Sequence, residues 1–155
     1  MLRNVYRYLT IPGFKITVRY RLQQYLRTAW GGKFTSIIVH IFEFFYVRLT
    51  SHYCCSLSPG TKIGEGVFFP HNFPLVINPA AQIGKCCVIH PGVLVGTTRG
   101  KDGAPVIGDF CFLGDGCKIV GNCKIGDYVF IAPNAVVTKD IPSCSVVGSG
   151  VNIIL

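Results

Sequence analysis

Residues 77–137 read INPAAQIGKCCVIHPGVLVGTTRGKDGAPVIGDFCFLGDGCKIVGNCKIGDYVFIAPNAVV, and an aliphatic residue returns at every sixth position of this stretch. The single exception is position 101, which is a lysine. The positions that keep the pattern are Ile77, Ile83, Ile89, Val95, Ile107, Leu113, Ile119, Ile125, Ile131 and Val137. A pattern that persists over so many positions indicates an internal repeat.

A second column of residues supports the same repeat. Glycine often follows the aliphatic residue, as at Gly84 and Gly108, and the fifth place of each hexad is small, as at Cys87 and Ala135. Neither a helix nor a simple strand alternation has a period of six. Short strands joined by tight turns do, and three of them close a triangular coil of about 18 residues. We therefore predict an all-β solenoid, a parallel β-helix built from hexapeptide repeats.

Basic residues concentrate before the repeat. Residues 1–50 contain eight Lys and Arg against one acid, Glu43, whereas residues 51–155 contain seven against six. The first 50 residues also lack the hexad pattern. We therefore divide the chain into a basic N-terminal arm, residues 1–50, and a solenoid domain, residues 51–155.

The arm mixes aromatic, aliphatic and basic residues in two stretches, Phe14 to Trp30 and Phe34 to Leu49. Gly31 and Gly32 separate them, so we expect two helices. The apolar run in the second is shorter than the roughly 20 residues of a spanning helix. Two roles stay open: a cap on the open end of the solenoid or a neighbouring subunit, and an interfacial arm that holds the protein at an anionic membrane.

Eight cysteines would suggest disulfides in a small secreted protein, but no stretch has the pattern of a secretory signal peptide. Four of them, Cys87, Cys111, Cys117 and Cys123, occupy the small fifth place of the hexad. We interpret these as buried apolar side chains in a reducing compartment, and we expect a cytoplasmic location at the inner face of the membrane. A zinc site is the alternative, although the CxxC spacing is missing; we expect no metal requirement.

Two irregularities interrupt the repeat. Eight positions separate the interior residues Phe69 and Ile77 instead of six, and an insertion of this kind must bulge outward at a corner; His71 lies in that bulge. Residues 97–105, TTRGKDGAP, have loop composition and are expected to leave the solenoid wall. An exposed loop on a rigid scaffold is a usual place for a binding lid.

Two of the four histidines, His71 and His90, lie in the repeat. Counting the two inserted residues, they occupy the same corner of successive coils, where strands stack about 4.8 Å apart. One small substrate would then contact both. An imidazole with a pKa near 6.5 can accept a proton from an alcohol at neutral pH. As alternatives, His90 shapes a turn before Pro91, or the solenoid is a non-catalytic scaffold.

The residues also carry a resemblance to a known family. The hexads, the segments IGEGVFFPHNFPLVINPAAQIG and IGDFCFLGDGCKIVGNCKIGDYVFIAPNAVVTKDIP, and the arm segment PGFKITVRYRLQQYLR resemble the serine acetyltransferase branch of the hexapeptide acyltransferases. Within it, the sequence most resembles the short colanic-acid-type and other polysaccharide O-acetyltransferases. The resemblance implies a left-handed β-helix, a homotrimer, and acetyl-CoA bound between neighbouring subunits.

Carried over to this sequence, the resemblance implies roles for individual residues. His71 matches the catalytic histidine, the general base that deprotonates the acceptor hydroxyl, and we add His90 as a second catalytic candidate. The candidate cofactor contacts are a backbone wall with an eighteen-residue spacing and a lysine near a CoA phosphate: Gly96, Thr97, Gly114, Asp115, Ala132 with Pro133, and Lys139.

The sequence departs from serine acetyltransferases at defined positions. Ser56 stands where those enzymes have an aspartate, and Ala104 stands where they have a second histidine. The usual GxPA(K/R) ending is replaced by Gly148 to Asn152. From these departures we expect an acetyl-CoA-dependent O-acetyltransferase that acts on a hydroxyl of a surface polysaccharide or its lipid-linked precursor.

Other functions are weighed against this one. Serine O-acetylation is the first alternative. A zinc enzyme of the γ-carbonic anhydrase type needs three histidines, and the repeat supplies two. Nucleic-acid binding is not expected, since the solenoid is nearly neutral and no binding motif is present.

Overall fold

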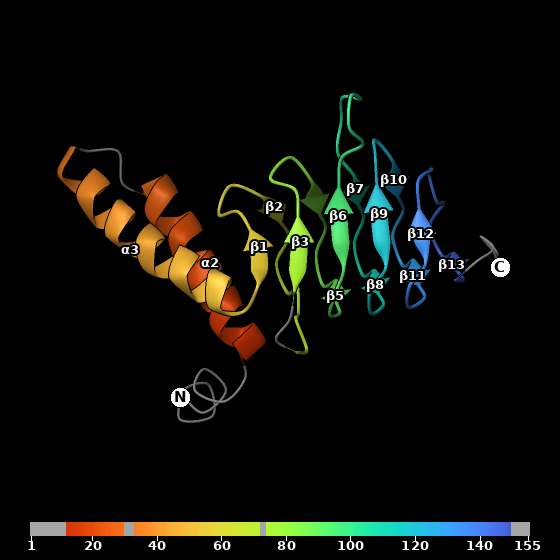
Figure 1. Ribbon diagram of the computed structural model, residues 1–155, viewed down its shortest axis with the longest axis horizontal. Coiled ribbons are helices and arrows are strands. Elements are labelled where there is room, and N and C mark those ends of the chain that lie inside the picture. The colour runs from red at the N-terminus through yellow and green to blue at the C-terminus, as the bar shows by residue number, and fades with distance from the viewer. Residues whose placement is uncertain (1–11, 30–32, 72–73, 150–155) are drawn as a thin grey trace.

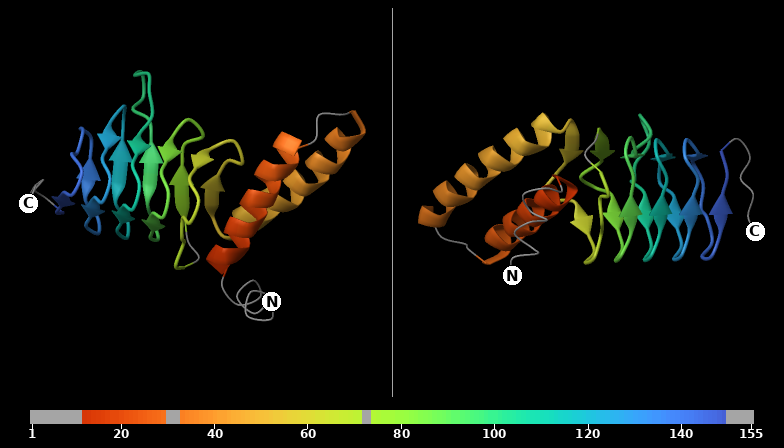
Figure 2. Two further views of the ribbon diagram at one scale, coloured as in Figure 1. Left: turned by 180° about the vertical axis from the view of Figure 1, so that it is seen from behind. Right: turned by 90° about the horizontal axis from the view of Figure 1, so that it is seen from below.

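The computed structural model describes residues 12–29, 33–71 and 74–149. Two antiparallel helices lead into a β-solenoid of about five turns, and the helices stand at its N-terminal end (Figure 1). Figure 2 shows from two further sides that the coils stack in a single column away from the helices. The predicted solenoid with a short helical region is thus confirmed.

The two expected helices are present. α2 spans Pro12–Ala29 and α3 spans Lys33–His52. Pro12 suits the first position of a helix, since its missing N–H has no partner there in any case. Among the described residues, neither helix is long and apolar enough to cross a bilayer.

The strands form three parallel sheets, one on each side of the coil. The first sheet contains β1 (Cys55–Leu57), β3 (Leu75–Ile77), β6 (Leu94–Gly96), β9 (Lys118–Val120) and β12 (Val136–Val137). The second contains β2 (Lys62–Ile63), β4 (Gln82–Ile83), β7 (Val106–Ile107) and β10 (Lys124–Ile125). The third contains β5 (Val88–Ile89), β8 (Phe112–Leu113), β11 (Phe130–Ile131) and β13 (Val146–Val147).

The coil is left-handed. In Figure 1 the chain runs up the first sheet, which faces the viewer, and crosses over the top to the second sheet behind. It then returns below through the third sheet while it advances away from the helices. This handedness agrees with the prediction from family resemblance and is opposite to the usual right-handed crossover between parallel strands.

The residues predicted to lie inside the solenoid are buried in the structure. All ten aliphatic positions of the repeat are buried, and so is the small fifth place, including Cys87 and Ala135. Residues next to them along each strand point outward, as the alternating burial of β4 and β10 shows. Each coil therefore buries its apolar residues on the coils above and below it.

The register shows where the coil is irregular. Val76 pairs with Leu94, 18 positions later, whereas Cys55 pairs with Leu75, 20 positions later. Leu94 pairs with Lys118, 24 positions later, so the loop at residues 97–105 adds six residues. Six is one whole hexad, which is why the inward positions keep their period beyond the loop. The loop projects from the corner above β6 in Figure 1, as expected.

The helices cover the open end of the solenoid. The Tyr20 hydroxyl donates to the Thr61 carbonyl, and the Arg21 guanidinium donates to the Ile63 carbonyl at 2.8 Å and to that of Gly64. From α3, the Tyr46 hydroxyl donates to the Leu57 carbonyl at 2.8 Å. Without the helices, these carbonyl groups of the first coil would form an exposed sheet edge. The capping role proposed for the arm therefore has a direct structural basis.

The C-terminal end is only partly described. β13 continues the third sheet by pairing Val146 with Phe130. β13 is the last strand of the described chain, and residues 150–155 lie outside it.

Candidate active site

The corner that links the third sheet to the first carries both histidines of the repeat. Phe68 bridges to Val88, so the residues that follow, His71 and His90, stand at this corner in consecutive coils. Their ring centroids are 6.4 Å apart. The predicted juxtaposition is confirmed, and we call this edge of the solenoid the histidine corner.

A small cleft opens between the histidines and the helix cap. Its lining is apolar apart from the two imidazoles, and consists of Ile16, Cys55, Phe69, His71, Leu75, Ile89, His90 and Pro91. The side chain of His71 is exposed and that of His90 is about one-fifth exposed. The cleft itself holds about 10 Å³, the room of about one water molecule, so a larger molecule would reach the two imidazoles from its open mouth.

His90 is held in place from two sides. Its Nδ1 lies 3.2 Å from Oδ2 of Asp115, and its ring packs against Phe112 with centroids 4.7 Å apart. Because the Nδ1–H points to the carboxylate, Nε2 is the nitrogen directed to other partners. The carboxylate therefore fixes the orientation of the ring, as second partners do for catalytic and metal-ligating histidines.

The candidate cofactor residues separate into two groups. Gly114, Asp115 and Ala132 follow β8 and β11 and lie at the histidine corner. Gly96, Thr97 and Lys139 lie at a different edge, the corner between the first and second sheets, which we call the loop corner.

The expectation of one straight column through Gly96, Gly114 and Ala132 is therefore wrong. Gly96 pairs with Val120 in the next coil, because the six-residue loop displaces the numbering by one hexad. A ligand that contacts both groups must reach two corners, either of one chain or of two neighbouring chains.

The backbone groups at the histidine corner also differ from the expectation. The N–H groups of Gly114 and Ala132 donate to Ile131 and Val147 within the ladder, at 2.9 and 2.8 Å. These amides are therefore not available to a cofactor arm. Gly114 instead lets neighbouring coils approach closely, since a Cβ there would lie 2.7 Å from the Ile131 carbonyl oxygen of the next coil.

Sequence reasoning missed the role of Asp115 beside His90. The spacing of the two residues carried the signal. They are 25 positions apart, which is one coil of 18 residues, the six residues of the loop and one more position. Counting the loop as a whole hexad would have placed the carboxylate beside the imidazole.

The cysteines expected inside the coil are buried there as thiols. Cys87 Sγ donates to the Gly108 carbonyl at 3.2 Å, and Cys111 Sγ donates to that of Gly126 at 3.1 Å. Burial raises the pKa of Cys117 to about 12. Among the described residues, no three His, Cys, Asp or Glu side chains come together in a group that could hold a metal ion.

Comparison with known proteins identifies relatives of the solenoid and of its histidine corner. Residues 104–139 match the family described as bacterial transferase hexapeptide (six repeats). This chain carries a bacterial transferase hexapeptide repeat. The repeat as defined by that family ends at the lysine of the loop corner, Lys139, and includes Asp115 of the histidine corner.

Relatives extend the likeness over nearly the whole hexapeptide-repeat chain. A serine acetyltransferase of Synechococcus elongatus is 32% identical over 143 residues, which are 90% of this chain and 56% of that protein. The structure of Brucella abortus serine acetyltransferase in complex with coenzyme A superposes with a TM-score of 0.78 and 26% identity, covering 94% of this chain and 56% of that one. Neisseria gonorrhoeae serine acetyltransferase in complex with serine gives 0.74 and 25%, covering 94% and 57%.

Two further points follow. The chain spans about half the length of the curated relatives it matches. The expected closeness to polysaccharide O-acetyltransferases finds no support, since the relatives found are serine acetyltransferases.

Proposed function

We propose that the protein is an acetyl-CoA-dependent O-acetyltransferase and that the histidine corner is its active site. The observation that carries the proposal is the pair His71 and His90, 6.4 Å apart beside an apolar cleft, in a chain similar to serine acetyltransferases over 90% of its length. An exposed imidazole at the mouth of this cleft can act as a base on an acceptor that approaches from the open side.

The reaction requires one proton to move out and back. His71 removes the proton of the acceptor hydroxyl as the oxygen attacks the thioester carbonyl carbon of acetyl-CoA. The tetrahedral intermediate then breaks the carbon–sulfur bond. The coenzyme A thiolate takes the proton from His71, which leaves an O-acetyl ester, free CoA and a neutral imidazole.

His90 acts beside this base. Its Nδ1–H is tied to Asp115, so its Nε2 is turned to the substrate side at a fixed angle. We infer that it orients the acceptor or stabilises the oxygen of the intermediate.

The acceptor class follows from the relatives, which favour serine over a saccharide. L-serine is therefore the proposed acceptor. Two residues set this chain apart from those enzymes: Ser56 is exposed on β1, and Ala104 packs partly buried at the loop corner. Because Ser56 lacks the carboxylate of that aspartate and Ala104 lacks the imidazole of that histidine, we expect weaker binding of L-serine than in those enzymes, and saccharide hydroxyls belong in the same assay.

A homotrimer is part of the proposal. The outward residues of the second sheet include Lys62, Gln82 and Lys124 together with Val106. The first sheet exposes Val76 and Val136, at 45% and 54%, together with Ser56 and Lys118. The exposed valines of the first sheet, with Phe130 and Val146 of the third, suit threefold packing around an axis parallel to the coil. Such packing would bring the histidine corner of one protomer to the loop corner of the next and unite the two groups of cofactor residues.

The test is release of CoA thiol from acetyl-CoA with L-serine, with a panel of free and lipid-linked saccharides, and with no acceptor, followed by mass spectrometry of the product. O-acetylserine above the background without acceptor supports the proposal as stated. Product on a saccharide alone would keep the chemistry and change the acceptor. CoA release that no acceptor stimulates would contradict the proposal.

A further inference from the structure

The helix pair covers the solenoid with one side of each helix and leaves the other side apolar. Ile16 and Tyr20 of α2 and Tyr46 of α3 are buried against the first coil. The described parts of the two helices expose eight large apolar side chains. Tyr25 and Val47 are two of them, and we call the other six the outer face: Val18, Leu22, Ile41, Phe42, Phe44 and Phe45.

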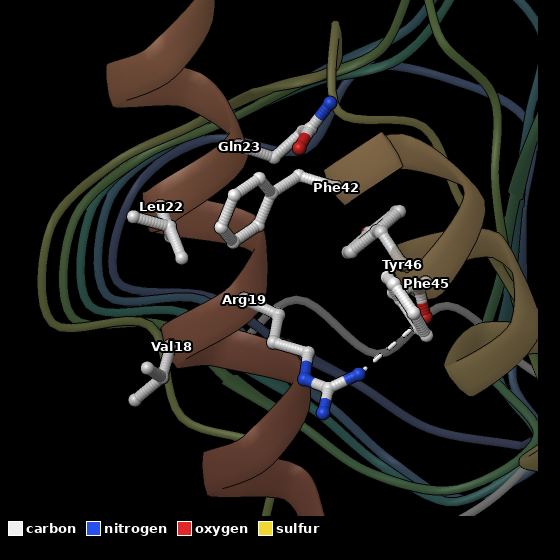
Figure 3. Close-up of a pocket in the computed structure, with 7 residues that line it drawn as sticks. All are labelled: Val18, Arg19, Leu22, Gln23, Phe42, Phe45 and Tyr46. Atoms are coloured by element: carbon white, nitrogen blue, oxygen red, sulfur yellow. Dashed lines mark hydrogen bonds between the residues drawn. The ribbon is translucent and has the colours of Figure 1, made fainter. Parts of the chain in front are cut away.

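The outer face is continuous across both helices. Val18 and Leu22 of α2 face Phe42 and Phe45 of α3 across a groove of about 290 Å³ (Figure 3). Phe44 is 62% exposed and packs edge-on against Phe45, with centroids 5.7 Å apart. Contiguous apolar surface of this kind on a soluble domain marks a site that something covers.

The charges around the face are positive. Arg19 lines the groove and donates to the Phe45 carbonyl at 3.4 Å, and Arg48 is exposed one turn beyond Phe44. Glu43, the only acid among residues 1–50, is half-buried on α3. The arm as a whole has eight basic residues against that one acid.

We propose that the outer face binds the surface of an anionic phospholipid bilayer. The phenylalanines enter the boundary between headgroups and acyl chains, and Arg19 and Arg48 contact the phosphates. A second copy of the chain fits less well, because twofold pairing of this face would bring the arginines of two basic arms together. Since neither described helix can span a bilayer, the helices would lie along its surface.

This inference does not depend on acetyl transfer. It assigns the arm two roles on opposite sides of the same helices, the cap on the inner side and the lipid contact on the outer side. The solenoid would then be held with its coils directed away from the membrane, because the outer face and the coils lie on opposite sides of the helix pair.

The test is co-sedimentation of the full chain with vesicles of equal parts phosphatidylglycerol and phosphatidylcholine, and with phosphatidylcholine alone, at low and high salt. We expect binding to the anionic vesicles only, weakened by salt. The double variant Phe44→Ser and Phe45→Ser is expected to lower the affinity for vesicles about tenfold or more. Arg48→Gln is expected to weaken the binding and reduce its dependence on salt.

The control is Tyr128→Ser, which removes an aromatic side chain of equal exposure, 60%, from a solenoid corner. It should leave vesicle binding unchanged. Thermal unfolding and the mass in solution are measured for each variant. The proposal is overturned by the absence of vesicle binding, by binding that the phenylalanine variant retains, or by a loss of oligomeric mass in that variant, which would make the face a contact between copies.

Discussion

At the scale of single residues, the contact between His90 and Asp115 can be tested by removing the carboxylate that orients the His90 ring. Asp115→Asn keeps the shape and removes the charge 3.2 Å from Nδ1. We expect kcat for L-serine-dependent CoA release to fall roughly tenfold, because the His90 ring loses the partner that orients it. The control is Glu65→Gln, an exposed carboxylate at another corner. A wild-type kcat in Asp115→Asn would remove the positioning role.

The site residues that could be predicted from the sequence are those whose position the repeat itself determines. His71 and His90 could be placed from the sequence, because the hexad gives each residue a corner and a coil. Asp115 was selected for the wrong reason, since its partner depends on how many residues the loop adds. The capping bonds of Tyr20 and Arg21 were not predictable, because the repeat says nothing about how a helix meets the first coil.

At the scale of elements, the loop at residues 97–105 adds one whole hexad. Removing residues 98–103 joins Thr97 to Ala104 and leaves six positions between Val95 and Ile107. We expect this six-residue deletion to keep the fold, with a melting temperature within a few degrees of the wild type. The measurement is thermal unfolding followed by circular dichroism. Loss of the folded state would show that the loop stabilises the coils rather than extending from them.

The helix cap makes a second prediction at this scale. Arg21→Met keeps the aliphatic stem and leaves the Ile63 and Gly64 carbonyls without their charged donor. We expect a loss of about 2 kcal/mol in the free energy of unfolding, measured in urea. Arg48→Met, which changes an exposed arginine of α3, is the matched control and should have little effect. Equal stability of the two variants would contradict the capping role of α2.

At the scale of the whole molecule, the buried thiols report on the integrity of the coil. Cys54, Cys86 and Cys144 are exposed and the other five cysteines are buried. A thiol reagent at neutral pH should therefore modify three thiols per chain rapidly and the remaining five only on unfolding. Rapid modification of all eight would contradict the described packing.

The same thiols predict how stability depends on pH. Burial raises the pKa of Cys55 and of Cys117 to about 12, from an ordinary value of 9.0. Both thiols stay neutral in the folded state, while in the unfolded chain they ionise above pH 9. Their contribution to stability is therefore complete below pH 9 and is lost as the pH rises toward 12. Urea unfolding across this range measures it, with Cys55→Ala and Cys117→Ala variants expected to flatten the decline.

The whole-molecule features differ in how far the sequence could specify them. The coil could be predicted from the hexad, because an inward aliphatic residue at every sixth position fits neither a helix nor a plain strand. The contacts between subunits are not contained in the repeat of one chain, and the arm has the composition of both a cap and a membrane-binding helix. Composition alone cannot separate these roles, because one helix can use its two sides differently.

The central claim is that His71 is the base of an acetyl transfer at the histidine corner. The most direct measurement is the rate of L-serine-dependent CoA release by His71→Asn beside the wild type, with His52→Ala as a control outside the repeat. We predict that His71→Asn lowers kcat roughly 10²- to 10⁴-fold. The control should turn over at an unchanged rate, and the thermal stability of both variants should be unchanged. A folded His71→Asn protein that turns over at the wild-type rate would contradict it.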